Sequence, residues 1–409
     1  MLARGWIVAY NFDKSGRSGL DMKTIDTLHE KEFGVRPQII GEVPGVCTLF
    51  GNFSDLCEGW AVIGTSNGYV RLAVSKRDDG MVRLYNATSN DRKHFFLNSL
   101  KYRKEDRWGN FIKGVISVLA GENYRLEGMD ITCDGPVLLG DMNALGTALC
   151  MATCITLNQL YGLGLSSQDL IRDSYRAMVG FNQRPCRICY LVTMLHCPPG
   201  KVLFFDLDTM GYQEIDFPFG SEKGDCFAVL LESKISQGAM REEVNIRRDD
   251  TKAALAELKR LHLGSGAIRE FPEKELHNRQ VKMAEPKLHI CSYVLMESQE
   301  SVLAAKLLKL KDARALGKVM NRVQSGLRDL MEVTCPETDW LAKRAGETQG
   351  CFGAMQVYDG MAGNILMLFD KPGWDRYQPR LEDYGHIFGF HPKWHIYQSP
   401  GSMQITYPR

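Results

Sequence analysis

The chain has 409 residues, of which 44% are hydrophobic and 24% are charged. This is an ordinary globular composition, and the length is sufficient for two or three domains with a large buried core. Lysine and arginine number 50 and aspartate and glutamate 49, so the formal net charge is only +1 and we expect no nucleic-acid partner.

The N-terminal segment and the cysteines indicate the compartment. Residues 1–14 hold a short apolar patch interrupted by Asn11 and Asp13, which is too short for a signal-peptide core and too polar to span a membrane. Several of the twelve cysteines, such as Cys150 and Cys154, lie in apolar runs, where a reduced thiol packs as a small hydrophobic side chain. We therefore expect a cytoplasmic protein without a membrane partner.

The first predicted elements mix strands and helices. Tyr69–Val74 and Val202–Leu207 are rich in β-branched and aromatic residues, which predicts strands. Residues 143–161 carry small and apolar side chains on nearly every face, which predicts a buried helix. Ser166 and Asp169 have the spacing of a capping box, which marks the start of the next helix.

The second half of the chain is mainly helical until residue 346. Apolar residues at three- and four-residue spacings predict amphipathic helices at Asp249–His262, Ser301–Leu310, Ala313–Met331 and Glu337–Ala345. Gly346–Phe369 then has the pattern of a glycine-rich loop and strands. His386, His391 and His395 lie in an aromatic tail, which we expect to close the core rather than to form a ligand cage.

Four stretches carry a family resemblance. Residues 43–59 read VPGVCTLFGNFSDLCEG; taken alone, their glycines, proline and aspartate would predict only a tight turn between strands. WGNFIKGVISVL follows at 108–119, SGLRDLMEVTCPETDWL at 325–341 and TQGCFGAM at 348–355. In this order the stretches resemble motifs of the galactokinases, a family within the GHMP small-molecule kinases.

The resemblance covers roughly residues 28–400 and implies an α+β protein with the GHMP kinase fold. An N-terminal lobe like domain 2 of ribosomal protein S5 would be followed by a ferredoxin-like C-terminal lobe. We place these lobes at residues 1–212 and 213–409. An active member of the family would use ATP and magnesium as cofactors.

The phosphate loop implied by the resemblance is degenerate. The family form, P-L-G-x-G-L-S-S-S-A, opens a helix and presents backbone amides to the phosphates. The matching segment here is PVLLGDMNAL, in which Pro136 and Gly140 persist but the serine run is replaced and includes Asn143. Asp141 adds a negative charge where a phosphate would bind. We therefore expect family-type ATP binding to be lost.

The implied metal and catalytic positions are also substituted. Residues 177–191, AMVGFNQRPCRICYL, align with the family stretch that carries the magnesium-ligand glutamate and the catalytic aspartate. Met178 takes the place of that glutamate, Arg187 that of a glycine, and Tyr190 that of the aspartate. A thioether cannot replace a hard oxygen ligand, and a phenol with an ordinary pKa of about 10 is a poor base at neutral pH.

Sugar contacts of the family are mostly lost as well. Val46 takes the place of the second catalytic group, an arginine, and Val244 that of a tyrosine beside the sugar. Asn52 and Phe53 replace a glutamate and a histidine, while Asp55 persists. We therefore assign substrate binding only to Asp55 and Asn52, and no catalytic or metal-binding residue. The apolar replacements predict that side chains fill the old cleft or that it has become a surface for another ligand or a protein.

The fold motifs of the family are retained, but its charged catalytic and metal-binding groups are lost. This combination predicts a catalytically inactive galactokinase homologue, a pseudokinase, without bound ATP or magnesium. Its role would be regulatory, sugar-sensing or that of a scaffold, and its partner a small-molecule sugar or a protein. The first alternative is an active sugar or small-molecule kinase with a rebuilt site that uses Asp55, Asp141 or Asp134. The second is a binding module that keeps a sugar pocket.

Cys186 and Cys189 form a C-x-x-C, for which a redox or zinc role is weighed against simple packing.

Overall fold

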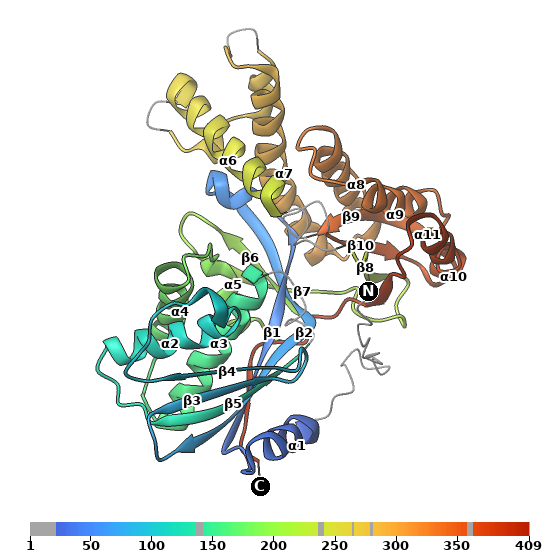
Figure 1. Cartoon of the computed structure of the whole chain (residues 1–409). Helices are drawn as coiled ribbons and strands as arrows, with labels where there is room; N and C mark the ends of the chain where they lie inside the picture. The colour runs from blue at the N-terminus through green and yellow to red at the C-terminus, as the bar shows by residue number, and fades with distance from the viewer. Residues whose placement is uncertain are drawn as a thin grey trace, which may run out of the picture.

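The computed structural model describes residues 22–135, 142–235, 241–263, 266–278, 281–357 and 363–408. Two sheets organise these residues into a lower and an upper lobe (Figure 1), which is the α+β architecture that the sequence predicts. Among the helices in these ranges, none combines the length and the apolar character needed to cross a lipid bilayer.

The larger sheet has the strand order β12-β1-β2-β5-β3-β4, and β2 also pairs with β6, which pairs with β7. All of these pairs are antiparallel except β3 with β5. The bounds are β1 Ile39–Phe50, β2 Trp60–Arg77, β3 Met81–Asn86, β4 Asp91–Phe96, β5 Gly128–Asp134, β6 Lys201–Asp206, β7 Tyr212–Asp216 and β12 Gln404–Thr406. The strands predicted at Tyr69–Val74 and Val202–Leu207 are confirmed as parts of β2 and β6.

Helices cover both faces of this sheet. Alternate residues of β2 face opposite sides, so Leu72 and Val74 join a core with α3, whereas Ala73 packs with α1. The helix predicted at 143–161 is confirmed as α3, and the capping box of Ser166 and Asp169 is confirmed at α4. The bounds are α1 Met22–Phe33, α2 Gly109–Gly121, α3 Met142–Tyr161, α4 Ser167–Arg176 and α5 Ile188–His196.

The smaller sheet is antiparallel, with the order β11-β8-β10-β9. Its strands are β8 Phe227–Glu232, β9 Cys351–Val357, β10 Asn364–Phe369 and β11 Lys393–Ile396. The surrounding helices are α6 Arg241–Leu258, α7 Glu285–Leu310, α8 Ala313–Asp329, α9 Pro336–Gly346, α10 Lys371–Tyr377 and α11 Arg380–Phe388. The aromatic tail closes this core, where the rings of Trp374 and Trp394 lie 4.7 Å apart.

Two predicted helices begin earlier in the structure. The segment Ser301–Leu310 is only the end of α7, which starts at Glu285 and buries polar residues such as Ser292 among its apolar ones. This mixed burial hides the amphipathic stripe by which a helix is recognised. The helix predicted from Asp249 likewise begins at Arg241, within a charged stretch.

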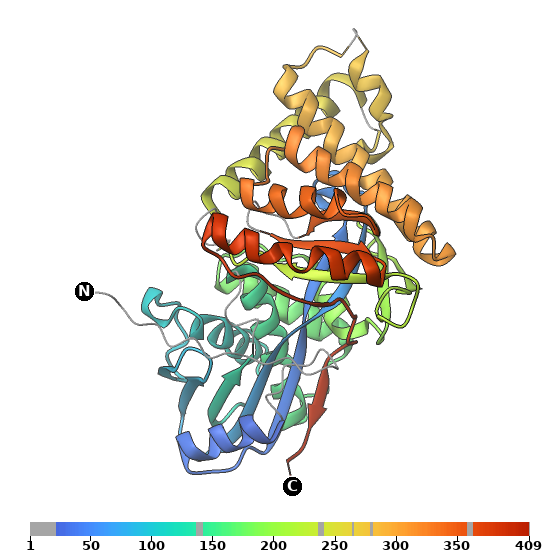
Figure 2. The same cartoon turned by 90° about the vertical axis from the view of Figure 1, so that its right-hand side faces the viewer.

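The C-terminal segment returns from the upper lobe to the lower one. After β11 in the smaller sheet, the chain descends to β12 beside β1, as Figure 2 shows in red. β7, which begins at Tyr212, still belongs to the larger sheet. The division of the chain at residues 212 and 213 stays a prediction.

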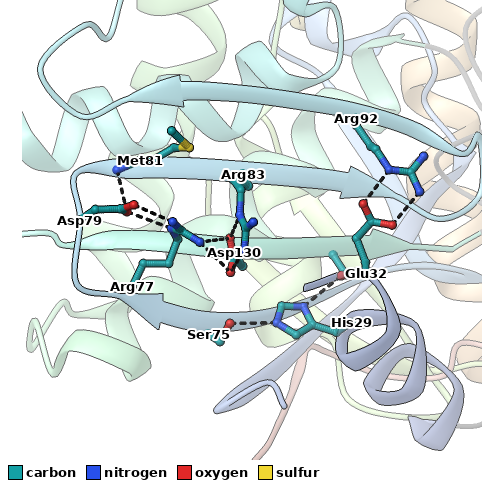
Figure 3. Close-up of polar contacts among 10 residues, drawn as sticks. His29, Glu32, Ser75, Arg77, Asp79, Met81, Arg83, Arg92 and Asp130 are labelled. Atoms are coloured by element: carbon teal, nitrogen blue, oxygen red, sulfur yellow. Dashed lines mark hydrogen bonds and ion pairs between the residues drawn. The ribbon is translucent and has the colours of Figure 1, made fainter. Parts of the chain in front are cut away.

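Polar contacts fix α1 to the outer face of the larger sheet (Figure 3). The ring nitrogens of His29 lie 2.9 Å from the hydroxyls of Thr132 and Ser75, and all three side chains are buried. Glu32 accepts two hydrogen bonds from Arg92 of β4, each at 2.6 Å. The helix therefore has one buried and one exposed anchor.

The buried anchor should make stability depend on pH. Burial lowers the pKa of His29 from 6.5 to about 4; Asp130 opposes this effect and Arg83 adds to it. Because the unfolded chain binds this proton more tightly, stability is lost as the pH falls from the unfolded value toward 4. We expect His29 to account for a loss of about 2 kcal/mol in the free energy of unfolding between pH 7.5 and 5.

Urea unfolding of the wild type and of His29→Asn at both pH values measures this contribution. The pH dependence of the variant should be smaller by about 2 kcal/mol, whereas His94→Asn, on the exposed side of β4, should keep the full dependence; His395, whose pKa is also lowered by burial, contributes equally in all three proteins. An unchanged pH dependence in His29→Asn would contradict the assignment.

Candidate functional site

The loop after β1 begins with a turn that requires glycine. Gly51 has a φ of +91°, and a Cβ atom there would lie 2.5 Å from the carbonyl oxygen of Trp60. A left-handed backbone and a blocked side chain both exclude other residues. The turn leads into a short 3-10 helix, Ser54–Cys57, which carries Asp55.

A buried glutamate of the upper lobe holds this loop. The carboxylate oxygens of Glu297, in α7, accept hydrogen bonds from the backbone amides of Asn52 and Phe53, each at 2.9 Å. The Glu297 side chain is fully buried. Charge-assisted bonds of this kind are stronger than bonds between neutral groups, so Glu297 fixes the loop that positions Asp55.

Two arginines engage the Asp55 carboxylate. Arg248 of α6 donates to Oδ2 at 2.5 Å, and the Arg187 guanidinium lies 3.4 Å from Oδ1. The side chains of Asp55, Arg187 and Arg248 are 25%, 14% and 19% exposed, so solvent screens these contacts only in part. Both oxygens of Asp55, the carboxylate that the resemblance assigns to substrate binding, therefore lie close to cations of the same chain, although only Oδ2 accepts a hydrogen bond from one of them.

Tyr190 belongs to the same network. Its hydroxyl lies 2.9 Å from that of Thr48 and accepts a hydrogen bond from Arg187 at 3.1 Å. Arg187 also donates to the carbonyl oxygen of Asn52 at 2.7 Å. This arrangement suits a structural bridge between the start of α5 and the loop after β1, since the phenol is already engaged by a hydroxyl and a guanidinium.

The other substituted positions are buried. Val46 is 9% exposed and Met178 is fully buried; a Cβ atom added to Gly146 of α3 would lie 2.9 Å from the sulfur of Met178. Asn52 is buried, and its side-chain oxygen has no hydrogen-bond partner within the described part of the chain. At Val46 and Met178, apolar side chains thus occupy positions that the resemblance assigns to charged groups.

Part of the predicted site lies outside the described residues. These positions are Pro136, Gly140, Asp141 and the side chains of Asn143 and Val244. The strand before the loop, β5, ends at Asp134, and the amide of the next residue, Gly135, donates to the hydroxyl of Thr88 at 3.2 Å.

The described residues do not fit the cofactors of an active kinase. Met178, which the resemblance aligns with a magnesium-ligand glutamate, is a fully buried thioether, and Asp55 is paired with two arginines. No group of three potential metal-binding side chains occurs within the described ranges. We therefore derive no step through ATP or magnesium.

The C-x-x-C pair has the environment of packed thiols. Burial raises the pKa of Cys186 to about 11, and its sulfur lies 3.9 Å from the hydroxyl of Thr147. Cys189 is buried, and both are free thiols. A raised pKa keeps a thiol protonated and unreactive at neutral pH.

Sequence reasoning missed three members of this site: Thr48, Arg248 and Glu297. Arg248 lies in the stretch EEVNIRR, but its charge alone does not distinguish it from other helix-surface arginines. Glu297 is a carboxylate on a helix whose neighbours Tyr293 and Val294 are fully buried. A charged residue among apolar ones was the signal that could have identified it, because buried charges are almost always paired.

Comparison with known proteins finds relatives of this chain among the galactokinases. No protein-family model matches the sequence. It is 26% identical to a candidate galactokinase of Treponema pallidum (strain Nichols), over 91% of this chain and 93% of that one. It is 24% identical to the galactokinase of Roseiflexus sp. (strain RS-1), over 90% of this chain and 92% of that one.

Solved structures agree with this placement. The Lactococcus lactis galactokinase complexed with galactose superposes with a TM-score of 0.84 at 18% identity, covering 93% of this chain and 99% of that one. Methanococcus jannaschii mevalonate kinase gives a TM-score of 0.59 at 13% identity, covering 88% and 98%. At these identities the likeness shows the fold. Together with the sequence relatives, it makes the chain a galactokinase homologue with the GHMP kinase fold.

Proposed function

We propose that this galactokinase homologue no longer transfers phosphoryl groups and acts as a regulatory, sugar-sensing or scaffold protein. The observation that carries the proposal is the pairing of Asp55 with Arg187 and Arg248. A carboxylate that binds a sugar hydroxyl must be able to accept its hydrogen bond. Here Oδ2 accepts a hydrogen bond from Arg248, and Oδ1 is buried 3.4 Å from the Arg187 guanidinium without a hydrogen bond among the described residues, so a sugar hydroxyl would have to compete with two cations of the protein itself.

The proposal includes the absence of bound ATP and magnesium. Phosphoryl transfer requires the triphosphate and its metal to be held and the attacking hydroxyl to be oriented. Met178 is buried and offers only sulfur, and Tyr190 is bonded to Thr48 and Arg187. Asp141, in the loop, adds like charge beside a phosphate. Met178 argues against holding the metal, Asp141 against holding the triphosphate, and Tyr190 against orienting the attacking hydroxyl.

An active kinase with a rebuilt site is the competing function. It would need Asp55, Asp141 or Asp134 as replacement carboxylates. Asp134 is 2% exposed; it is paired with Arg71 at 3.2 Å and accepts from Thr88 at 3.1 Å. Its position favours a structural role, and the same is true of Asp55. Asp141 lies outside the described residues.

We also propose a cytoplasmic location and a small-molecule sugar or a protein as partner. All twelve cysteines are free thiols, as expected of a protein in a reducing compartment. The Lactococcus lactis relative was solved with galactose, which makes neutral hexoses the first ligands to test. The balanced charge gives no support to nucleic acid.

A coupled assay tests the loss of activity directly. Purified protein with ATP, magnesium and galactose should release no ADP above the rate without sugar, and ATP should not raise the melting temperature. An active galactokinase in the same buffer provides the positive control. Magnesium-dependent turnover that survives further purification would overturn the proposal, and its loss in Asp55→Ala or Asp141→Ala would then identify the rebuilt site.

A further inference from the structure

A cavity of about 530 Å³ lies where the two lobes meet, away from the Asp55 cluster. Its walls come from β1, β2, the turn after β7 and the segment at 398–404 that joins β11 to β12. None of Asp55, Arg187, Arg248 and Tyr190 is among the described residues that line it. The volume falls within the range typical of small-molecule sites, about 300–1,000 Å³.

An irregularity in β2 shapes one wall. Pro44 of β1 pairs with Tyr69, but the next residue, Gly45, pairs with Ser66. Asn67 and Gly68 are therefore extra residues in β2, and both line the cavity. Bulges re-aim side chains and are common beside binding sites.

The wall formed by residues 398–401 is held in place by hydrogen bonds and is therefore preformed. The hydroxyl of Thr65 lies 2.8 Å from that of Ser399 and accepts from the amide of Gly401 at 3.2 Å. The side-chain amide of Gln398 donates to the carbonyl oxygen of Gly220 at 2.9 Å. Gly401 has a φ of +100°, and a Cβ there would lie 2.7 Å from the ring of Pro199. A ligand would meet a wall that needs little ordering on binding.

The lining matches an uncharged, hydroxyl-rich molecule. Tyr69 and Phe217 supply aromatic surface, which can pack against the apolar face of a sugar ring. Hydroxyl and amide side chains supply both donors and acceptors, from Ser66, Asn67, Ser221, Gln398, Ser402 and Gln404.

The charges in the lining exclude anions. The described lining residues include no lysine or arginine. Glu42 contributes a carboxylate, and the buried Arg71, 3.9 Å behind it, is already paired with Asp134 at 3.2 Å. A phosphate group would therefore lose its hydration without gaining a cation. We infer that this cavity is a second binding site, which takes a neutral saccharide of one or two rings and discriminates against its phosphorylated forms.

Calorimetric titration of the full chain tests the inference. Galactose, glucose and lactose serve as neutral probes, and galactose 1-phosphate and inorganic phosphate as charged ones. At least one neutral probe should bind saturably, and the phosphorylated sugar should bind at least about tenfold more weakly. Absence of saturable binding by all three neutral probes, or tighter binding of galactose 1-phosphate, would overturn the inference.

Two variants locate the binding. Ser402→Trp puts a large ring into the cavity and should raise the Kd by about tenfold or more, whereas Ser325→Trp, on the exposed side of α8, should not change it. Binding that is lost in Asp55→Asn but kept in Ser402→Trp would assign the sugar to the Asp55 cluster and contradict the inference.

Hydrogen exchange on the wild type gives a readout that does not depend on a variant folding. A bound neutral sugar should slow amide exchange at 66–68 and 398–402, because a ligand stabilises the segments that hold it. Protection at 52–55 without protection of these two segments would contradict the inference. Neither result bears on ADP release, so the loss of kinase activity succeeds or fails separately.

Discussion

Replacing Glu297 by alanine should lower the free energy of unfolding by about 4 kcal/mol. The carboxylate of Glu297 is buried and accepts the backbone amides of Asn52 and Phe53 at 2.9 Å. Its removal leaves two donors without this acceptor and opens a space between α7 and the loop. Each lost charge-assisted bond costs about 1.5–3 kcal/mol. Urea unfolding monitored by circular dichroism measures the loss.

The next glutamate on the same helix, Glu300, provides a matched control. Glu300 forms a bidentate pair with Arg322, and the two side chains are 14% and 48% exposed. A pair that is open to solvent on one side contributes about 1 kcal/mol, so Glu300→Ala should cost much less than Glu297→Ala. Glu297→Gln should lie between the two, because one amide oxygen can still accept. Equal losses in Glu297→Ala and Glu300→Ala would show that the loop does not depend on Glu297.

Asp55→Ala should destabilise the protein by about 2 kcal/mol, which is opposite to the expectation for a working binding site. A carboxylate that faces an open substrate pocket commonly costs stability, so its removal is neutral or stabilising. Here removal leaves the guanidinium groups of Arg187 and Arg248 close together without their shared anion. Removing one partner of a buried pair costs about 3–5 kcal/mol, and we reduce this value because Asp55 is 25% exposed.

A double-mutant cycle separates the pair from other effects of the substitution. Asp55→Ala in an Arg248→Ala background should cost at least about 1 kcal/mol less than in the wild type. Asp249→Ala is the control, since this carboxylate is 74% exposed and forms its ion pair with Lys252. A stabilising Asp55→Ala, or an additive cycle, would favour a ligand-binding carboxylate and weaken the pseudokinase proposal.

Local sequence patterns were sufficient to predict much of the fold. The capping box at Ser166, the buried helix α3 and the strand that became β6 each depend on residues close in sequence. The start of α7 was missed for a physical reason. Its first half buries polar and apolar residues together, including Glu297, so no amphipathic stripe marks it.

The sequence predicted which charged groups of the family the site lacks, but not which residues contact one another in it. The resemblance assigned substituted roles to Val46, Met178 and Tyr190, and these assignments stay predictions. What replaced those groups depends on contacts between distant segments. Asp55 and Arg248 are 193 positions apart, and Glu297 lies 245 positions from Asn52. Such pairings follow from the packing of α6 and α7 over the loop, which no local pattern reveals.

The return of the chain to β12 also has a consequence for synthesis on the ribosome. Strands β1 to β5 are available once residue 134 has been made, yet the outer edge of β1 obtains its partner only with residues 404–406. Until then β1 exposes unpaired backbone groups at Ile40 and Glu42, which other nascent chains could pair with. The edge of β1 therefore stays without this partner while residues 135–403, roughly two thirds of the chain, are being made.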